Sequence, residues 1–255
     1  MALVWIAEDD DCLVDLLHFV LEQAGFSVEA FNDGGAVLQA VAERLPDLLV
    51  LDLGLPRVDG HRVCEALRQN PLTSFLPVLI LTGRKDVADR YRSFANGADD
   101  YLTKPFDGLE LILRIRNRLR RARLVSGGPV EERLRVGDVE LDLANHRVRA
   151  GSRSSQLTGS EFAILRMLMS SPGRAVDVEA LLTEALGYPP RLGNPEILRT
   201  HVRNLRQKLE DDPGRPRRLI NLPRLGYLVN AEPALDADRI VALEVSGERP
   251  NSNAG

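Results

Sequence analysis

The sequence is poor in cysteine and in aromatic residues, and it contains no long apolar run. Its two cysteines, Cys12 and Cys64, have no metal-ligand spacing and are expected to be reduced core thiols. Aromatic residues make up only 5% of the chain, so its cores must be aliphatic. No run approaches the ~18 apolar residues of a membrane span. The apolar start at residues 1–7 is followed by four acidic residues, which argues against a signal peptide. We therefore expect a cytoplasmic protein with no membrane partner.

The chain is nevertheless long and apolar enough for two domains, with 255 residues of which 44% are hydrophobic. Its net charge of −4 is unevenly distributed. Residues 1–121 contain 14 basic and 19 acidic residues, whereas residues 134–230 contain 15 and 11. Residues 231–255 contain 2 and 5. The middle block is therefore the better candidate for a polyanionic partner, although many surfaces have a surplus of this size.

Residues 1–121 alternate between short apolar runs and segments whose apolar residues recur at helical spacing. The runs lie at 3–7, 27–31, 48–51, 78–81 and 101–102. Strands that are buried on both faces read as continuous apolar runs, so the pattern predicts a five-stranded parallel sheet between helices, a doubly wound α/β domain. In such a sheet, ligands bind beyond the carboxyl ends of the strands.

This pattern ends at residues 122–133, where Ser126-Gly127-Gly128-Pro129 predicts a linker. The following residues, 134–230, predict a second domain of mixed α and β structure. Strand-like pieces lie at 139–143 and 147–149, helical segments near 158–170, 177–186 and 195–210, and a hairpin pattern at 217–229. Residues 231–255 are polar, and we expect a largely disordered tail.

Polar residues follow the apolar runs of the first domain. Glu8 and Asp9 follow the first run, Asp52 and Thr82 end the third and fourth, and Lys104 follows the fifth. Carboxyl ends of parallel strands share one edge of the sheet, so these side chains should converge. Three clustered carboxylates repel one another and require a cation, and hard oxygen ligands favour Mg²⁺. Asp52 would then attack a phosphoryl group whose oxygens contact Lys104 and Thr82.

Each of these residues also has a purely structural explanation. A single Asp after a strand is more often a helix cap or turn residue, Thr82 before Gly83 can close a turn, and Lys104 can be a solvated surface residue. Their combined order on successive strand ends favours one shared site.

The motifs around these residues resemble the receiver domain of two-component response regulators. They are Ile6-Ala7-Glu8-Asp9-Asp10, the segment Leu51–Gly60, Leu81-Thr82, and the segment Gly97–Phe106. The resemblance covers residues 1–121. It implies that a sensor histidine kinase phosphorylates Asp52, that Thr82 and Tyr101 form a switch pair, and that the Lys104–Pro105 bond is cis. It also implies that Mg²⁺ is held by Glu8, Asp9, Asp52 and the Gly54 carbonyl.

The same resemblance implies a dimer. In relatives with winged-helix outputs, the face that corresponds to residues 90–121 forms a two-fold dimer on phosphorylation. Two ion pairs of that pattern are matched here, Arg90 with Glu110 and Asp100 with Arg114. Without the resemblance, a solvated helical face would explain these charges equally well.

The helix expected at 194–210 has an apolar face and an adjacent basic one. The apolar face is formed by Leu198, Val202, Leu205 and Leu209, and the basic one by Arg199, Arg203 and Arg206. Three guanidinium groups on one stripe favour an anionic partner such as DNA, although a solvated basic face has the same pattern.

Residues 134–229 resemble the winged-helix DNA-binding domain of the OmpR/PhoB subfamily, through the segments Leu157–Leu165, His201–Glu210 and Leu225–Tyr227. The resemblance implies that the third helix enters the major groove of double-stranded DNA, that the hairpin reaches the minor groove, and that loop 187–194 contacts RNA polymerase. The implied DNA contacts are Arg199, Thr200, His201, Arg203, Asn204, Arg206 and Arg224. The helix start, the loop and the wing depart from the family pattern, so the operator sequence is not predicted.

Two other functions would use some of the same residues. A Mg²⁺-dependent phosphohydrolase of the haloacid-dehalogenase type has a second Asp two residues after its nucleophile, where this chain has Gly54. A regulator that works without phosphorylation would not need Glu8, Asp52 and Lys104 together. We therefore predict a phosphorylation-controlled transcription regulator that is not a turnover enzyme.

Overall fold

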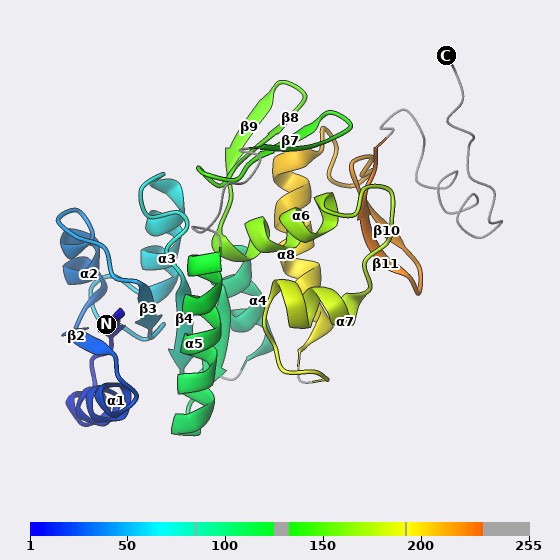
Figure 1. The fold of residues 1–255 in the computed structure, drawn as a ribbon. Helices are drawn as coiled ribbons and strands as arrows, with labels where there is room; N and C mark the ends of the chain where they lie inside the picture. Colours follow the sequence, from blue (N-terminus) through cyan, green and yellow to red (C-terminus); the bar gives the residue numbers. More distant parts are fainter. Residues whose placement is uncertain (85, 125–132, 192, 232–255) are drawn as a thin grey trace, which may run out of the picture.

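The apolar runs of the first domain form a five-stranded parallel sheet in the order β2-β1-β3-β4-β5 (Figure 1). The computed structural model describes residues 1–84, 86–124, 133–191 and 193–231. The strands are β1 (Leu3–Ala7), β2 (Ser27–Phe31), β3 (Leu48–Leu51), β4 (Val78–Thr82) and β5 (Asp100–Thr103). Every residue of β3 and β4 is buried, as expected for strands that are covered on both faces. The prediction of a doubly wound domain is confirmed.

Helices cover both faces of this sheet, and aspartates cap the first four. The helices are α1 (Asp11–Gln23), α2 (Gly34–Ala40), α3 (Gly60–Gln69), α4 (Val87–Ala95) and α5 (Gly108–Leu124). The side chains of Asp10, Asp33, Asp59 and Asp86 accept hydrogen bonds from backbone N–H groups of the first turns. Helix α5 runs into the predicted linker, of which residues 125–132 lie outside the described residues.

One glycine fixes the loop that carries Asp52. A Cβ atom on Gly60 would lie 2.2 Å from the backbone oxygen of Asp52 and 2.9 Å from Cα of Leu53. Helix α3 therefore begins in direct contact with the end of β3, at a distance that only glycine permits. This contact positions the Asp52 backbone at the carboxyl edge of the sheet.

The second domain has two antiparallel sheets and a group of helices. A four-stranded sheet is formed by β6 (Arg133–Val136), β7 (Val139–Asp142), β8 (Arg147–Ala150) and β9 (Arg153–Gln156). Next come α6 (Gly159–Met169), α7 (Val178–Ala180), η1 (Leu181–Ala185) and α8 (Pro195–Leu209), and then the hairpin β10 (Leu219–Leu222) and β11 (Gly226–Val229). Strands β6 and β9 were not predicted. The sequence of β9 is entirely polar, whereas β6 alternates with only two apolar residues, Leu134 and Val136, beside the predicted linker. Of the predicted tail, residues 232–255 lie outside the described residues.

The two domains are packed against each other. Helix α4 of the first domain lies beside α8 of the second (Figure 1). One hydrophobic cluster includes Phe94 and Tyr101 from the first domain as well as Phe162 and Leu198 from the second. Among the described helices, none is both long and apolar enough to cross a membrane.

Candidate functional site

Three carboxylates meet at the carboxyl edge of the parallel sheet, as the sequence predicted. One oxygen from each of Glu8, Asp9 and Asp52 lies within 4.8 Å of the other two. Glu8 and Asp52 are buried, with 3% and 8% exposure, whereas Asp9 is exposed. The backbone N–H of Asp52 donates to the carbonyl of Ala7 at 2.9 Å, which aligns the ends of β3 and β1. The sheet register therefore brings these three residues together.

Lys104 completes this group of charges. Its Nζ donates to Oε2 of Glu8 at 2.6 Å and to Oδ2 of Asp52 at 3.3 Å, and it precedes the predicted cis bond to Pro105. Burial raises the pKa of Glu8, Lys104 opposes this shift, and Asp52 adds to it, so the net pKa is raised. The single ammonium group thus leaves excess negative charge in the pocket. Oxygen ligands under this repulsion fit a divalent cation such as Mg²⁺.

The predicted switch residues, Thr82 and Tyr101, both form hydrogen bonds with the backbone of Arg84. Thr82 is 1% exposed, and its Oγ1 accepts a hydrogen bond from the N–H of Arg84 at 3.4 Å. The hydroxyl of Tyr101 donates to the carbonyl of Arg84 at 2.7 Å. A movement of either side chain would therefore act on the β4–α4 loop.

Gly54 leaves one side of the Asp52 carboxylate uncovered. A Cβ atom at Gly54 would lie 3.2 Å from Oδ2 of Asp52, so any side chain there would stand next to the proposed nucleophile. Gly54 is itself exposed, so no side chain at this position separates the Asp52 carboxylate from the surface.

Of the four predicted dimer residues, three are joined by ion pairs in the structure. Arg114 forms ion pairs with Asp100 at 2.9 Å and with Glu110 at 2.6 Å, all within one chain. Arg90 lies half-buried on α4, and in the described part of the chain no ion pair joins it to Glu110. The structure thus brings Asp100, Glu110 and Arg114 together within one chain. Asp100 with Arg114 is one of the two expected pairs, and its formation across a dimer stays a prediction.

The predicted DNA contacts fall into an exposed and a buried group. Arg199 and Arg203 on α8 are exposed, as is Arg224 in the β10–β11 turn. Arg206 is half-buried, and its Nε donates to the carbonyl of Leu219 at 3.0 Å. The buried group, which lies on the side of α8 that includes the α4 contact, is Thr200, His201 and Asn204.

Helix α4 covers part of this buried group. Nδ2 of Asn204 donates to the carbonyl of Phe94 at 3.0 Å, and the His201 ring lies 5.6 Å from the Phe94 ring. The helical periodicity identified the apolar face of α8. It contained no signal that polar residues of α8 would be covered by another domain.

Acidification should separate the two domains, because their contact buries neutral His201. The side chain is 1% exposed, and neither ring nitrogen has a hydrogen-bond partner among the described residues. Burial lowers the pKa of His201 from 6.5 to about 4. The charged groups that also act on its pKa are Asp99, Glu161, Arg118 and Asp100. In separated domains His201 would be exposed and would bind a proton near its ordinary pKa of 6.5. Between pH 6.5 and 4, each unit of acidification should favour separation about tenfold, with no effect above this window.

Small-angle scattering at neutral pH and near the middle of that window would measure this expansion. His201→Gln, which cannot titrate, is the control and should show a much smaller change. An equal expansion in the variant, or none in the wild type, would contradict the assignment to His201.

Comparisons with known proteins match both halves of the chain. Residues 4–116 match the family model for the response regulator receiver domain, and residues 152–229 match the model for the C terminal of transcriptional regulatory proteins. The DNA-binding dual master transcriptional regulator RpaA of Synechocystis is 40% identical over 229 residues, covering 89% of this chain and 94% of that protein. The phosphate regulon transcriptional regulatory protein PhoB of Rhizobium meliloti is 41% identical over 204 residues, covering 80% and 88%.

Other relatives extend over nearly the same length. The DNA-binding response regulator MtrA of Mycolicibacterium smegmatis is 36% identical over 224 residues, covering 88% of this chain and 95% of that protein. A solved structure of a RitR mutant shares the fold, with a TM-score of 0.75 and 22% identity over 90% of this chain and 99% of that one.

Proposed function

Because the chain belongs to the OmpR/PhoB-type response regulators, DNA-binding proteins that control transcription and are not turnover enzymes, we propose that phosphorylation of Asp52 controls its binding to DNA. The observation that supports this most strongly is the convergence of Glu8, Asp9 and Asp52, two of which, Glu8 and Asp52, also contact the ammonium group of Lys104. This arrangement would hold a carboxylate nucleophile, Asp52, beside a cation at the carboxyl edge of the sheet.

The proposed reaction moves a phosphoryl group from a histidine of the kinase to Asp52. A carboxylate oxygen of Asp52 attacks phosphorus, the phosphorus–nitrogen bond breaks, and an acyl phosphate forms. Lys104 is placed to bind a phosphoryl oxygen, and Thr82 supplies a hydroxyl donor. Mg²⁺, held by Glu8, Asp9, Asp52 and the Gly54 carbonyl, would neutralise charge on the transferring group.

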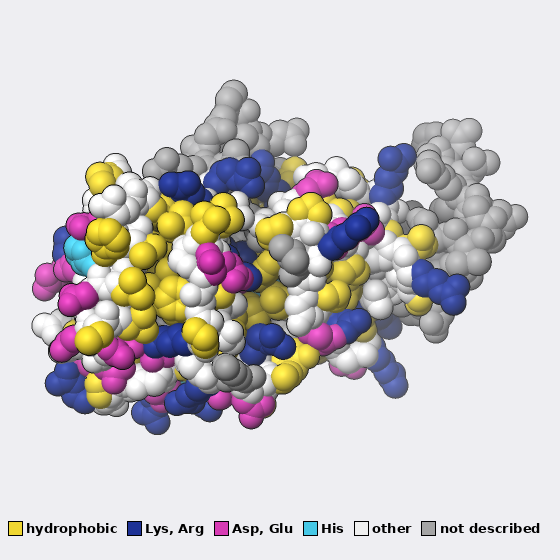
Figure 2. Space-filling model, turned by 90° about the horizontal axis from the view of Figure 1, so that it is seen from below, with side chains coloured by type: hydrophobic (Ala, Val, Ile, Leu, Met, Phe, Trp, Pro, Cys, Tyr) yellow, Lys and Arg dark blue, Asp and Glu magenta, His cyan; other side chains and the backbone are white. Residues whose placement is uncertain are grey.

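A protein donor needs a surface beside Asp52 on which to dock. Helices α1 and α5 start close to Asp9 and Lys104 in sequence, and a Cβ atom on Gly108 would lie 3.5 Å from Val20. Among the described side chains of these two helices, the large apolar ones that are exposed are Leu16, Phe19, Leu109 and Leu113. We assign this surface to the sensor histidine kinase. In the view from below, apolar side chains lie among charged ones on the left half, which is the receiver (Figure 2).

The DNA-binding half would place α8 in the major groove and the β10–β11 turn near the minor groove. Arg199, Arg203 and Arg224 are exposed for contacts with phosphates or bases, and isolated basic side chains project from the right half of the molecule (Figure 2). Full insertion of α8 also requires its buried side to leave α4. Dimer formation through Arg90, Asp100, Glu110 and Arg114, and a contact of loop 187–194 with RNA polymerase, remain parts of the proposal.

Acetyl phosphate with Mg²⁺ should add one phosphoryl group to the wild-type protein and none to Asp52→Asn. Intact-protein mass spectrometry measures the addition, and peptide mapping locates it. Chelation of Mg²⁺ should prevent the reaction in the wild type, because the crowded carboxylates then lack a divalent cation. Equal modification of Asp52→Asn, or full modification in the chelator, would contradict the proposed site.

A further inference from the structure

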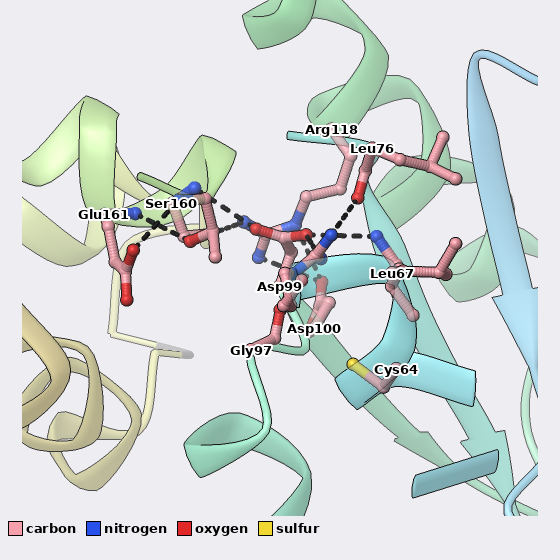
Figure 3. A network of polar contacts seen from close by, with 12 residues as sticks. Cys64, Leu67, Leu76, Gly97, Asp99, Asp100, Arg118, Ser160 and Glu161 are labelled. Atoms are coloured by element: carbon pink, nitrogen blue, oxygen red, sulfur yellow. Dashed lines mark hydrogen bonds and ion pairs between the residues drawn. The ribbon is translucent and has the colours of Figure 1, made fainter. Parts of the chain in front are cut away.

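Two consecutive carboxylates of the receiver bind the DNA-binding domain. Asp99 and Asp100 stand at the start of β5 and are 3% and 2% exposed. Oδ1 of Asp99 accepts a hydrogen bond from the backbone N–H of Ser160, in the first turn of α6, at 3.1 Å (Figure 3). Its Oδ2 accepts from Arg68 at 2.9 Å and from the N–H of Val78 at 3.0 Å. A receiver carboxylate therefore caps a helix of the other domain.

Asp100 binds a second segment of the DNA-binding domain. The hydroxyl of Tyr188, between η1 and α8, donates to Oδ1 of Asp100 at 2.9 Å. The guanidinium groups of Arg118 and Arg114 lie 5.4 and 5.6 Å from the centre of the Tyr188 ring. Tyr188 is only 5% exposed. The Tyr188 side chain thus lies among receiver residues: its hydroxyl contacts Asp100, and its ring contacts Arg114 and Arg118.

This contact is stabilised by charge. Burial opposes ionisation of Asp100, but Arg118 and Arg114 outweigh it and hold the pKa of Asp100 below its ordinary value. The tyrosine hydroxyl therefore donates to a charged acceptor, which is the stronger kind of hydrogen bond. Arg118 is itself 5% exposed and reaches Oγ of Ser160 at 3.5 Å, linking the two carboxylate contacts.

We propose that Asp99 and Asp100 form a docking site for the chain's own DNA-binding domain, that Tyr188 closes it, and that docking excludes the receiver dimer. This inference rests on the proposed function, because Asp100 and Arg114 are the residues assigned there to the dimer. While Tyr188 is bound, Asp100 is buried and cannot reach a second copy of the chain, and the Arg114 guanidinium is held by Asp100 and Glu110 of its own chain. One surface thus has two competing occupants.

The docking site is joined to the switch. Tyr101 follows Asp100 directly in β5, and its ring lies 6.4 Å from that of Phe94. Phe94 in turn contacts His201 and Asn204 of α8. An inward movement of the Tyr101 ring would therefore disturb both the carboxylate pair and the packing of α4 on α8.

Tyr188 is the position at which to test this docking. A substitution of Asp100 would alter the docking site and the dimer together, whereas Tyr188 belongs to the DNA-binding domain and has no assigned role in the dimer. Tyr188→Ala removes the ring and the hydroxyl, and Tyr188→Phe removes the hydroxyl alone while keeping the packing. Without phosphorylation, Tyr188→Ala should raise the fraction of molecules with separated domains roughly 10- to 100-fold, because it loses the ring contacts and a hydrogen bond to a charged group. Tyr188→Phe loses only the hydrogen bond and should raise this fraction less. Tyr91→Phe, which removes a long hydrogen bond of 3.3 Å to half-buried Glu196 elsewhere between the domains, is the control and should change the separated fraction less than either Tyr188 variant.

Hydrogen exchange of α8 and β5 measures separation, and analytical ultracentrifugation measures dimer formation, on the full chain with and without acetyl phosphate and Mg²⁺. Faster exchange together with a dimer in unphosphorylated Tyr188→Ala would support the inference. Unchanged exchange in both Tyr188 variants would overturn the docking site. Separation without a dimer, while phosphorylated wild type dimerises, would overturn the competition. A phosphorylated wild type that stays monomeric would instead refute the proposed dimer and with it the competition, while exchange would still decide the docking site.

Discussion

Alanine at both Arg199 and Arg203 should weaken DNA binding roughly 30-fold to 25,000-fold, because each arginine contact with DNA contributes about 1–3 kcal/mol. Both side chains are exposed one turn apart on α8, whose opposite side holds the core of the domain. The loss should appear as a lower affinity in fluorescence anisotropy with labelled operator DNA. If both arginines contact phosphates, the slope of log affinity against log salt should fall by about 2.

A variant with the same change in net charge separates local contact from overall attraction. Arg133 and Arg149 are 61% exposed on the four-stranded sheet, where each pairs with Glu140. Their joint replacement by alanine should reduce affinity far less. If the two double variants bind DNA equally weakly, α8 is not the helix that enters the groove.

The receiver site could be predicted from the sequence because strand ends impose its geometry. Once the apolar runs are recognised as parallel strands, the residues that follow them must share one edge, whatever their separation in sequence. Glu8, Asp52 and Lys104 lie up to 96 positions apart and still meet within hydrogen-bond distance. Strand β9 was missed for the complementary reason, since Arg153–Gln156 has no apolar alternation and is held by pairing with β8.

The contact between the domains could not be predicted from the same patterns. Periodicity and strand order describe each domain separately, whereas Tyr188 and Asp100 meet only through the relative placement of the two domains. The buried positions of His201 and Asn204 follow from that placement as well, because in an isolated α8 both would belong to its polar surface. Asp99 was included in a receiver motif, but nothing in its sequence context indicated a hydrogen bond to the backbone of Ser160.

Phosphorylation should raise the affinity of the wild-type protein for a two-half-site operator about 100-fold to 10,000-fold. In the docked structure Asn204 of α8 contacts Phe94, and undocking would free this side of α8 for DNA. Undocking would also free Asp100 and Arg114 for a dimer. In a dimer the second half-site is bound by a domain that is already tethered nearby, and such linkage multiplies the affinity by this amount without a new kind of contact. A single half-site should show a smaller gain, because only undocking contributes.

The affinity of the full-length protein for this operator, measured at one fixed salt concentration before and after treatment with acetyl phosphate and Mg²⁺, tests the central claim most directly. The account predicts a large increase for the wild type and no change for Asp52→Asn. Equal affinity of the phosphorylated and unphosphorylated wild type, with modification of Asp52 verified by mass, would show that the receiver does not control DNA binding.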